Sequence, residues 1–298
     1  MATVDPSVRA SAIKGLDHVA VVSRRPDVLF GSYERLGFRL TPLSMHQGSI
    51  TPGEAPVAWG TGNRCAMMRT GYLELLALID PTAYCSTFPE LIDRYEGLHI
   101  VAFGCDDAAS AASRLAQAGI STPGVIDLQR ELDVAGDRRL ARFGLLRLGP
   151  GEAPEARVNI IQHHTPQYLW QPDLLDHPNG ALALREVAVC VADPDESAAR
   201  FARILGIAGT ADGAQRRFLL PHGRFVLVGP DDLARMHPDV RIPALPFVAS
   251  LTIGVADISA TAGLLAANAV AAQRRDGRIV VPPESGCGAI CVFERATS

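Results

Sequence analysis

The chain has 298 residues, of which 48% are hydrophobic and 20% are charged, and its formal net charge is -4. This composition predicts a folded globular protein with room for one large or two ordinary domains. It excludes the usual kind of nucleic-acid-binding protein, which carries a basic stripe. No stretch approaches the roughly 20 apolar residues of a membrane helix, and the N-terminus MATVDPSVRASAIKG lacks an apolar signal core. We therefore expect a cytoplasmic protein with no nucleic-acid or membrane partner.

The sequence also lacks the residues that common cofactors need. Lys14 is the only lysine and lies in the N-terminal tail, which disfavours a phosphate-binding loop and pyridoxal phosphate chemistry. The motifs H-E-x-x-H, G-x-S-x-G and G-x-G-x-x-G after a strand are absent. Six scattered cysteines indicate reduced thiols and not a disulfide scaffold.

A recurring pattern organises the predicted elements. A β-like run, a turn marked by Asp or Pro, and a helix rich in Ala, Leu and Arg follow one another in four segments, which begin at Gly15, Gly97, Leu184 and Ala249. Strand-like runs follow each helix; in the first segment they are FRLTPL, RCAMMRT and YLELLALI. The sequence therefore predicts four βαβββ units.

The segment after the second unit divides the chain. Residues 163–181 have turn chemistry and no clear period, which is typical of a linker. We predict a first domain over residues 1–166, a linker over 167–181 and a second domain over 182–298.

The phrases LDHVAVV, GTGNR and YLELLALID, together with the repeated unit, resemble the vicinal oxygen chelate superfamily and, within it, the glyoxalase-like domain family. The resemblance implies an α+β fold in which tandem βαβββ units form two curled-sheet cups. It also implies a divalent metal ion at the floor of a cup, with ligands from the first and last strands of each unit.

Strand alternation indicates which side chains would face the cup. It turns His18 away from Val19, groups Glu74 with Tyr72, and places His99 on the strand that begins the second unit. On the pattern of the superfamily His18, Glu74 and His99 would be the metal ligands. Two imidazoles and one carboxylate suit Zn, Ni, Mn or Fe and leave positions open for a substrate.

The fourth ligand position of the superfamily pattern holds Asn159, which is a weak ligand. An alternative is therefore that the metal has been lost and that Glu74 is an acid or base, or pairs with Arg64 or Arg69. In the second half the equivalent positions hold no such set, so a structural or substrate-shaping role is expected there.

Further candidates surround these positions. The Gly-Thr-Gly-Asn stretch at residues 60–63 predicts a tight turn at the rim of the cup. His163 shares the strand face of Asn159 and is a candidate substitute base beside Glu74, the other candidate catalytic residue. Expected substrate-binding residues are His46, Asn63, Arg64, Tyr72, Asn159 and Trp170.

Three functions remain open on the sequence. The leading one is a lyase or isomerase of glyoxalase-like type, dependent on a divalent metal, that stabilises an oxyanion or enediolate of a small oxygenated substrate. The second is an extradiol-type ring-cleaving dioxygenase with non-haem iron, and the third is a metal-free protein that binds small molecules such as drugs. The expected partner is a small-molecule substrate, and a homodimer is left open.

Overall fold

The computed structural model describes residues 13–48 and 57–296, and it divides into two compact units. Of the described residues, unit 1 comprises 13–18, 100–172 and 184–249, and unit 2 comprises 19–48, 57–99, 173–183 and 250–296. This grouping by contacts cuts across the predicted division at residues 167–181, which stays a prediction. None of the helices in the described ranges has the length and apolar composition of a membrane-spanning segment.

Unit 2 combines an early and a late part of the chain. In chain order its elements are β1 (Ile13–Ser23, shared with unit 1), α2 (Pro26–Arg35), β2 (Ser44–Gly48), β3 (Val57–Met67), β4 (Tyr72–Leu78) and α3 (Phe88–Arg94), followed later by β13 (Phe247–Val255, shared), α7 (Ile258–Ala267), β14 (Gln273–Arg275), β15 (Arg278–Val281) and β16 (Ile290–Arg295). Strands β2, β3 and β4 pair antiparallel, whereas β13 pairs parallel with β16. Helix α2 packs on β4, and α7 packs on β15 and β16.

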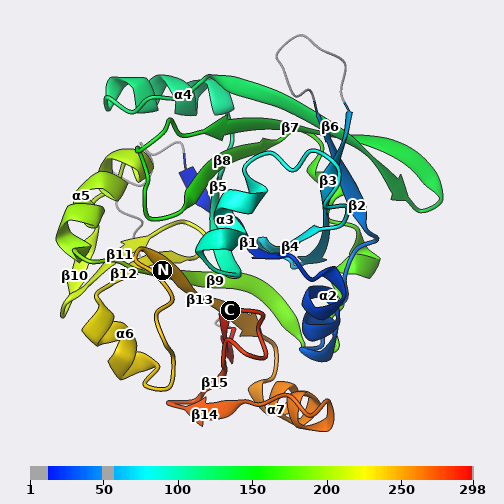
Figure 1. Cartoon of the computed structure of the whole chain (residues 1–298), viewed down its shortest axis with the longest axis vertical. Helices are drawn as coiled ribbons and strands as arrows, with labels where there is room; N and C mark the ends of the chain where they lie inside the picture. Colours follow the sequence, from blue (N-terminus) through cyan, green and yellow to red (C-terminus); the bar gives the residue numbers. More distant parts are fainter. Residues whose placement is uncertain (1–12, 49–56, 297–298) are drawn as a thin grey trace. The chain divides into compact units, whose positions relative to one another are not determined.

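Unit 1 comes mostly from the middle of the chain and shares β1 and β13 with unit 2. Its elements are β5 (Gly97–Cys105, shared), α4 (Ala108–Gln117), β6 (Val125–Val134), β7 (Asp137–Arg147), β8 (Arg157–His163), η1 (Pro166–Tyr168), η2 (Pro172–Leu174, shared), β9 (Ala181–Cys190, shared), α5 (Pro194–Leu205), β10 (Thr210–Asp212), β11 (Gln215–Leu219), β12 (Arg224–Val228) and α6 (Pro230–Met236). Strands β6, β7 and β8 pair antiparallel, and β8 pairs parallel with β5. Helix α5 lies against β11 and β12 (Figure 1).

Aspartates at the predicted turns start three of the helices. The side chain of Asp193 accepts hydrogen bonds from the backbone N–H groups of Asp195 and Glu196, and Asp107 and Asp257 cap α4 and α7 in the same manner. Gly206, which follows α5, adopts a left-handed conformation that a residue with a Cβ rarely takes. The expected helix boundaries therefore have a local chemical cause.

The first predicted strand after α2 is absent. Residues 38–43 form no regular strand. Thr41 instead exchanges two hydrogen bonds with Cys65, one through its backbone N–H and one through its hydroxyl oxygen. The threonine hydroxyl thus replaces the backbone carbonyl that a strand would use.

Two short helices, α3 and α6, have no counterpart in the predicted pattern. Each carries a proline in its first turn, where the missing N–H would be unpaired in any case. Neither is long enough to show a clear helical period, which explains why periodicity did not indicate them.

The core of unit 1 contains an aromatic cluster. Phe201 of α5, Phe218 of β11 and Phe225 of β12 are fully buried, and the rings of Phe201 and Phe225 lie 4.3 Å apart. The cluster joins the helix to the sheet, so its packing contributes directly to the stability of this unit.

Replacing Phe225 with alanine would leave a cavity at the centre of this cluster. We expect a loss of about 3–5 kcal/mol in the free energy of unfolding, measured by denaturant titration. Leu219→Ala on β11 is the matched control, because that side chain is 56% exposed, and it should cost less than about 1 kcal/mol. Equal effects of the two changes would contradict this description of the core.

Candidate functional site

Glu74 lies in β4 and shares a face of that strand with Tyr72. It pairs with Cys65 of β3, and Tyr72 pairs with Met67, so the two β4 residues share one face of the sheet. The side-chain amide of Asn63 donates a hydrogen bond of 2.5 Å to Oε1 of Glu74. Glu74 is half-buried, and this bond offsets part of the cost of removing its carboxylate from water.

A tight turn was expected at residues 60–63, and this prediction is wrong. Gly60, Gly62 and Asn63 lie within β3, and neither glycine has a positive φ. The glycines serve close packing instead, because a Cβ on Gly60 would lie 2.0 Å from the backbone oxygen of Asp80.

Arg64 is also placed differently from the expectation. It pairs with Leu75, on the opposite face of the sheet from Asn63 and Glu74. There its guanidinium donates to the Thr41 carbonyl, pairs with Glu34 of α2 and lies over the Phe30 ring. Arg64 therefore fastens α2 to the sheet, and the alternative that it pairs with Glu74 is wrong. Its role in substrate binding stays a prediction.

The other predicted substrate-binding residues of unit 2 lie on β2, β3 and β4. His46 of β2 shares a hydrogen bond of 3.0 Å between its Nδ1 and the hydroxyl of Thr61 on β3. Tyr72 is buried. Their roles in substrate binding stay predictions.

Unit 1 contains a carboxylate held between two imidazoles. Nδ1 of His18 donates to Oδ1 of Asp17 over 2.7 Å, and Nε2 of His163 donates to Oδ2 over 2.9 Å. Asp17 and His18 lie on β1, whereas His163 is the last residue of β8, 146 positions later in the chain. We call these three side chains the Asp17 cluster.

The two imidazoles of the Asp17 cluster stabilise the buried carboxylate between them. Burial by itself would raise the pKa of the Asp17 carboxyl, but hydrogen bonds from His163 and His18 and the charge of the two rings hold the pKa well below its usual range. Asp17 is therefore ionised at neutral pH and fixes the orientation and tautomer of both rings.

Aromatic side chains surround His163. Phe143 of β7 is the cross-strand partner of His163, and the two rings lie 5.4 Å apart in an edge-on arrangement. The ring of Trp170 lies 5.0 Å from the His163 ring, also edge-on. Trp170 follows η1, which begins at Pro166. Trp170 thus contacts the candidate base His163, and its role in substrate binding stays a prediction.

Strand register also locates Asn159 relative to His99. Asn159 pairs with Ala102 of β5 and with Arg147 of β7. Paired residues point to the same side of a sheet, so alternation along β5 puts Ala102 and Ile100 on the face of Asn159 and puts His99 on the other. His99 and Asn159 were both expected to face one cup, and the register does not bring them to one face.

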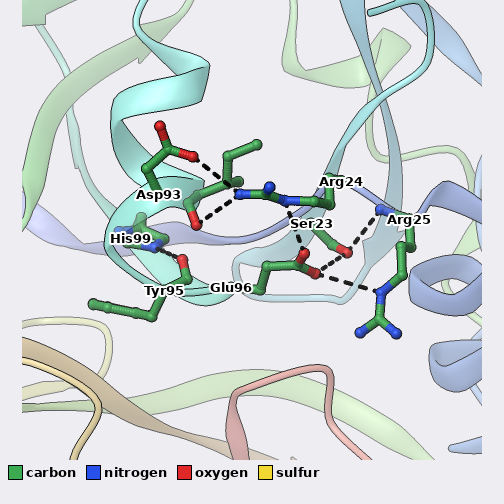
Figure 2. A network of polar contacts seen from close by, with 8 residues as sticks. Ser23, Arg24, Arg25, Asp93, Tyr95, Glu96 and His99 are labelled. Carbon is green, nitrogen blue, oxygen red and sulfur yellow. Dashed lines mark hydrogen bonds and ion pairs between the residues drawn. The ribbon is translucent and has the colours of Figure 1, made fainter.

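His99 belongs to a polar network that joins the end of β1 to the turn between α3 and β5 (Figure 2). Glu96 accepts from the hydroxyl of Ser23 and pairs with Arg24, which also bonds Asp93. His99 is buried, stacks on the Tyr95 ring at 4.0 Å, and donates from Nε2 to the Tyr95 carbonyl over 2.7 Å. Desolvation by burial lowers the pKa of His99 to about 4.

The predicted metal ligands each have a hydrogen-bond partner of their own. His18 bonds Asp17, Glu74 bonds Asn63 and His99 bonds the Tyr95 carbonyl. Among residues 13–48 and 57–296, no three His, Cys, Asp or Glu side chains are arranged to hold a metal ion. The described geometry does not fit a three-ligand metal centre, and the metal set stays a prediction from the sequence.

Asp17 is the residue that sequence reasoning missed. Only its neighbour in the LDHVAVV run was singled out, because alternation separates adjacent side chains onto opposite faces. The signal was the Asp-His pair itself, since a carboxylate is the usual partner that orients a functional histidine.

The sequence model of the glyoxalase-like domain matches residues 16–205, which is more than half of the chain. The chain belongs to the glyoxalase-like domain family. No curated protein matches this glyoxalase-like chain.

Solved structures share the fold of the glyoxalase-like chain at low sequence identity. A hypothetical protein from Staphylococcus aureus has a TM-score of 0.60 and 13% identity, over 94% of this chain and 99% of that one. A mutant 4-hydroxymandelate synthase from Streptomyces coelicolor has 0.60 and 16%, over 96% and 95%. A Mn(II)-bound glyoxalase from Novosphingobium aromaticivorans has 0.55 and 10%, over 95% and 82%. The predicted α+β fold of the vicinal oxygen chelate superfamily is confirmed.

Burial of a neutral His99 makes the glyoxalase-like chain sensitive to acid. Between pH 6.5 and about 4 the unfolded chain binds a proton at this residue and the folded chain does not, so stability falls as pH falls through that window. We expect His99 to account for about 3 kcal/mol of this loss, seen as a shallower pH dependence of unfolding in His99→Gln. A His164→Gln control, which changes an exposed imidazole, should keep the wild-type slope; an unchanged slope in His99→Gln would contradict the assignment.

Proposed function

We propose that the protein is an enzyme of glyoxalase-like type, a lyase or isomerase that moves a proton on a small oxygenated substrate. The observation that carries the proposal is the carboxylate of Asp17, buried between His18 and His163. Fold relatives named as a glyoxalase and as 4-hydroxymandelate synthase support enzymatic activity in general.

His163 is the proposed acid or base. A histidine that exchanges a proton with a substrate works best when a second group fixes its tautomer and stabilises its charged form. Asp17 meets both requirements, because it accepts from Nε2 of His163 and remains ionised. Proton exchange with a substrate would then use Nδ1 of the same ring. Asp17 is a positioning residue in this scheme.

The other candidate residues keep their proposed roles, although the structure does not gather them in one site with His163. Glu74 stays a proposed acid or base of unit 2, oriented by Asn63. His46, Tyr72, Asn159 and Trp170 stay proposed substrate-binding residues. The divalent metal is proposed on the family resemblance and on the Mn(II)-bound relative, although the described side chains do not form a site for it.

Deuterium exchange can test proton transfer across a panel of candidate substrates. Small hydroxy- and oxo-compounds incubated with the protein in deuterated water should incorporate deuterium next to a carbonyl, measured by proton NMR. We expect His163→Gln to lower the exchange rate roughly 10²-fold to 10⁴-fold and Asp17→Asn to lower it by a smaller factor with an altered pH profile. His164→Gln is the matched control, since it changes the exposed neighbour of His163. Full exchange activity in His163→Gln would overturn the proposal.

Metal content provides a separate test. Protein purified without chelators should carry roughly one divalent ion per chain if the predicted ligands bind it, measured by elemental analysis. His18→Ala and Glu74→Ala should each lower this content, and His164→Ala should not. Wild-type protein that is metal-free and fully active would remove the metal from the proposal.

Oxygen consumption with catechols and ferrous iron would favour the ring-cleaving dioxygenase, whereas tight drug binding without turnover would favour the binding protein.

A further inference from the structure

We infer that Arg130 binds an anionic group of the substrate beside His163, so that the substrates are small hydroxy- or oxo-carboxylates. The inference deepens the proposed function and rests on it for the role of His163. All the residues that carry it belong to unit 1.

Register places Arg130 on the face of the sheet that carries His163. Arg130 of β6 pairs with Ala141 of β7, and Phe143 of β7 pairs with His163 of β8. Ala141 and Phe143 are two residues apart, so they point to one side of β7, and their partners point to the same side. The Arg130 position therefore lies one step, roughly 7 Å, along the strands from the level of His163, and two strand spacings, roughly 10 Å, across the sheet, with β7 between them.

Ring contacts connect the guanidinium to the imidazole. The Cζ atom of Arg130 lies 5.6 Å from the centre of the Phe143 ring, which lies 5.4 Å from the His163 ring. The Trp170 ring in turn lies 5.0 Å from the His163 ring. A cation over an aromatic face is stabilised, but the ring cannot accept the in-plane hydrogen bonds of a guanidinium.

Arg130 has no acidic partner in the part of the chain that the structure describes. Its Nε atom is buried there without a hydrogen-bond acceptor. Arginines near the end of the same ribbon behave differently: Arg138 pairs with Glu131 at 2.7 Å, and Arg139 pairs with Asp137 at 2.8 Å. A desolvated guanidinium nitrogen without an acceptor is costly, so this position favours a ligand that supplies one.

Carboxylate chemistry meets this requirement. The planar fork of a guanidinium binds both oxygens of a carboxylate, which a neutral hydroxyl or carbonyl cannot match. The carboxylate of the cluster, Asp17, already accepts from two imidazoles. The two contacts of the Phe143 ring, 5.6 Å to the guanidinium carbon and 5.4 Å to the imidazole, bound the distance between Arg130 and His163. A small substrate that carries its acid group close to the reacting carbon can span this distance and contact both side chains.

Fluorescence of Trp170 can report binding directly. Trp59 and Trp170 are the two tryptophans of the chain, so a Trp59→Phe background leaves one emitter, in contact with His163. Glycolate, lactate and pyruvate would be titrated against their uncharged counterparts ethylene glycol, propane-1,2-diol and hydroxyacetone. We expect saturable changes with the acids, and at least roughly tenfold weaker responses with the neutral compounds.

Four variants locate the anion site. Arg130→Gln should weaken acid binding roughly tenfold to a hundredfold, and Arg130→Lys should retain part of it because the charge remains. Arg138→Gln removes the same charge from an exposed position of the same ribbon and should bind as wild type. Arg147→Gln removes another half-buried cation, which lies opposite Asn159 and further from His163, and should have a smaller effect than Arg130→Gln.

The outcomes separate this inference from the proposed function. Acid binding that depends on Arg130 supports the inference even if no deuterium exchange occurs, in which case the proposed function alone fails. The inference is overturned if Arg130→Gln, with wild-type thermal unfolding, binds the acids unchanged. It is equally overturned if the neutral compounds bind as well as the acids, if no acid binds, or if Arg147→Gln has the larger effect.

Discussion

The carboxylate of Asp17 is nine-tenths buried and ionised, a combination that requires strong local compensation. The compensation comes from two imidazoles that donate to its two oxygens, one from the same strand and one from the end of β8. Removing either ring would leave a buried charge with half of its partners. The arrangement therefore fixes the position of His163. The rings of Phe143 and Trp170 contact that imidazole, and Arg130 lies over Phe143.

Histidines in this chain have two different physical roles. His163 is bonded to an anion and suits proton exchange. His99 is bonded to a backbone carbonyl, and burial lowers its pKa to about 4, so it is neutral over the physiological range. The same residue type thus supports chemistry in one place and rigid packing in the other, and the difference lies in the charge of the hydrogen-bond partner.

Arginines show a similar division. Arg64 was expected to meet a substrate, but it faces α2, where it bonds Glu34 and the Thr41 carbonyl. Arg130 was not singled out from the sequence, yet its Nε lacks an acceptor among the described residues. Whether a cation is structural or available depends on the acids that the fold brings near it, and these come from distant parts of the chain.

The sequence by itself determined the class of fold, the helix starts at Asp107, Asp193 and Asp257, and the face of Glu74. Each follows from a local rule, namely hydrophobic period, capping chemistry or strand alternation. It identified His163 as a candidate base but not Asp17 as its partner. Only the tertiary structure decided that pairing, the separation of His99 from the face of Asn159, and the inclusion of residues 60–63 in β3. The physical reason is that hydrogen-bond partners and strand register are long-range properties: 146 positions separate Asp17 from His163, and no local pattern records which distant strand will lie beside another.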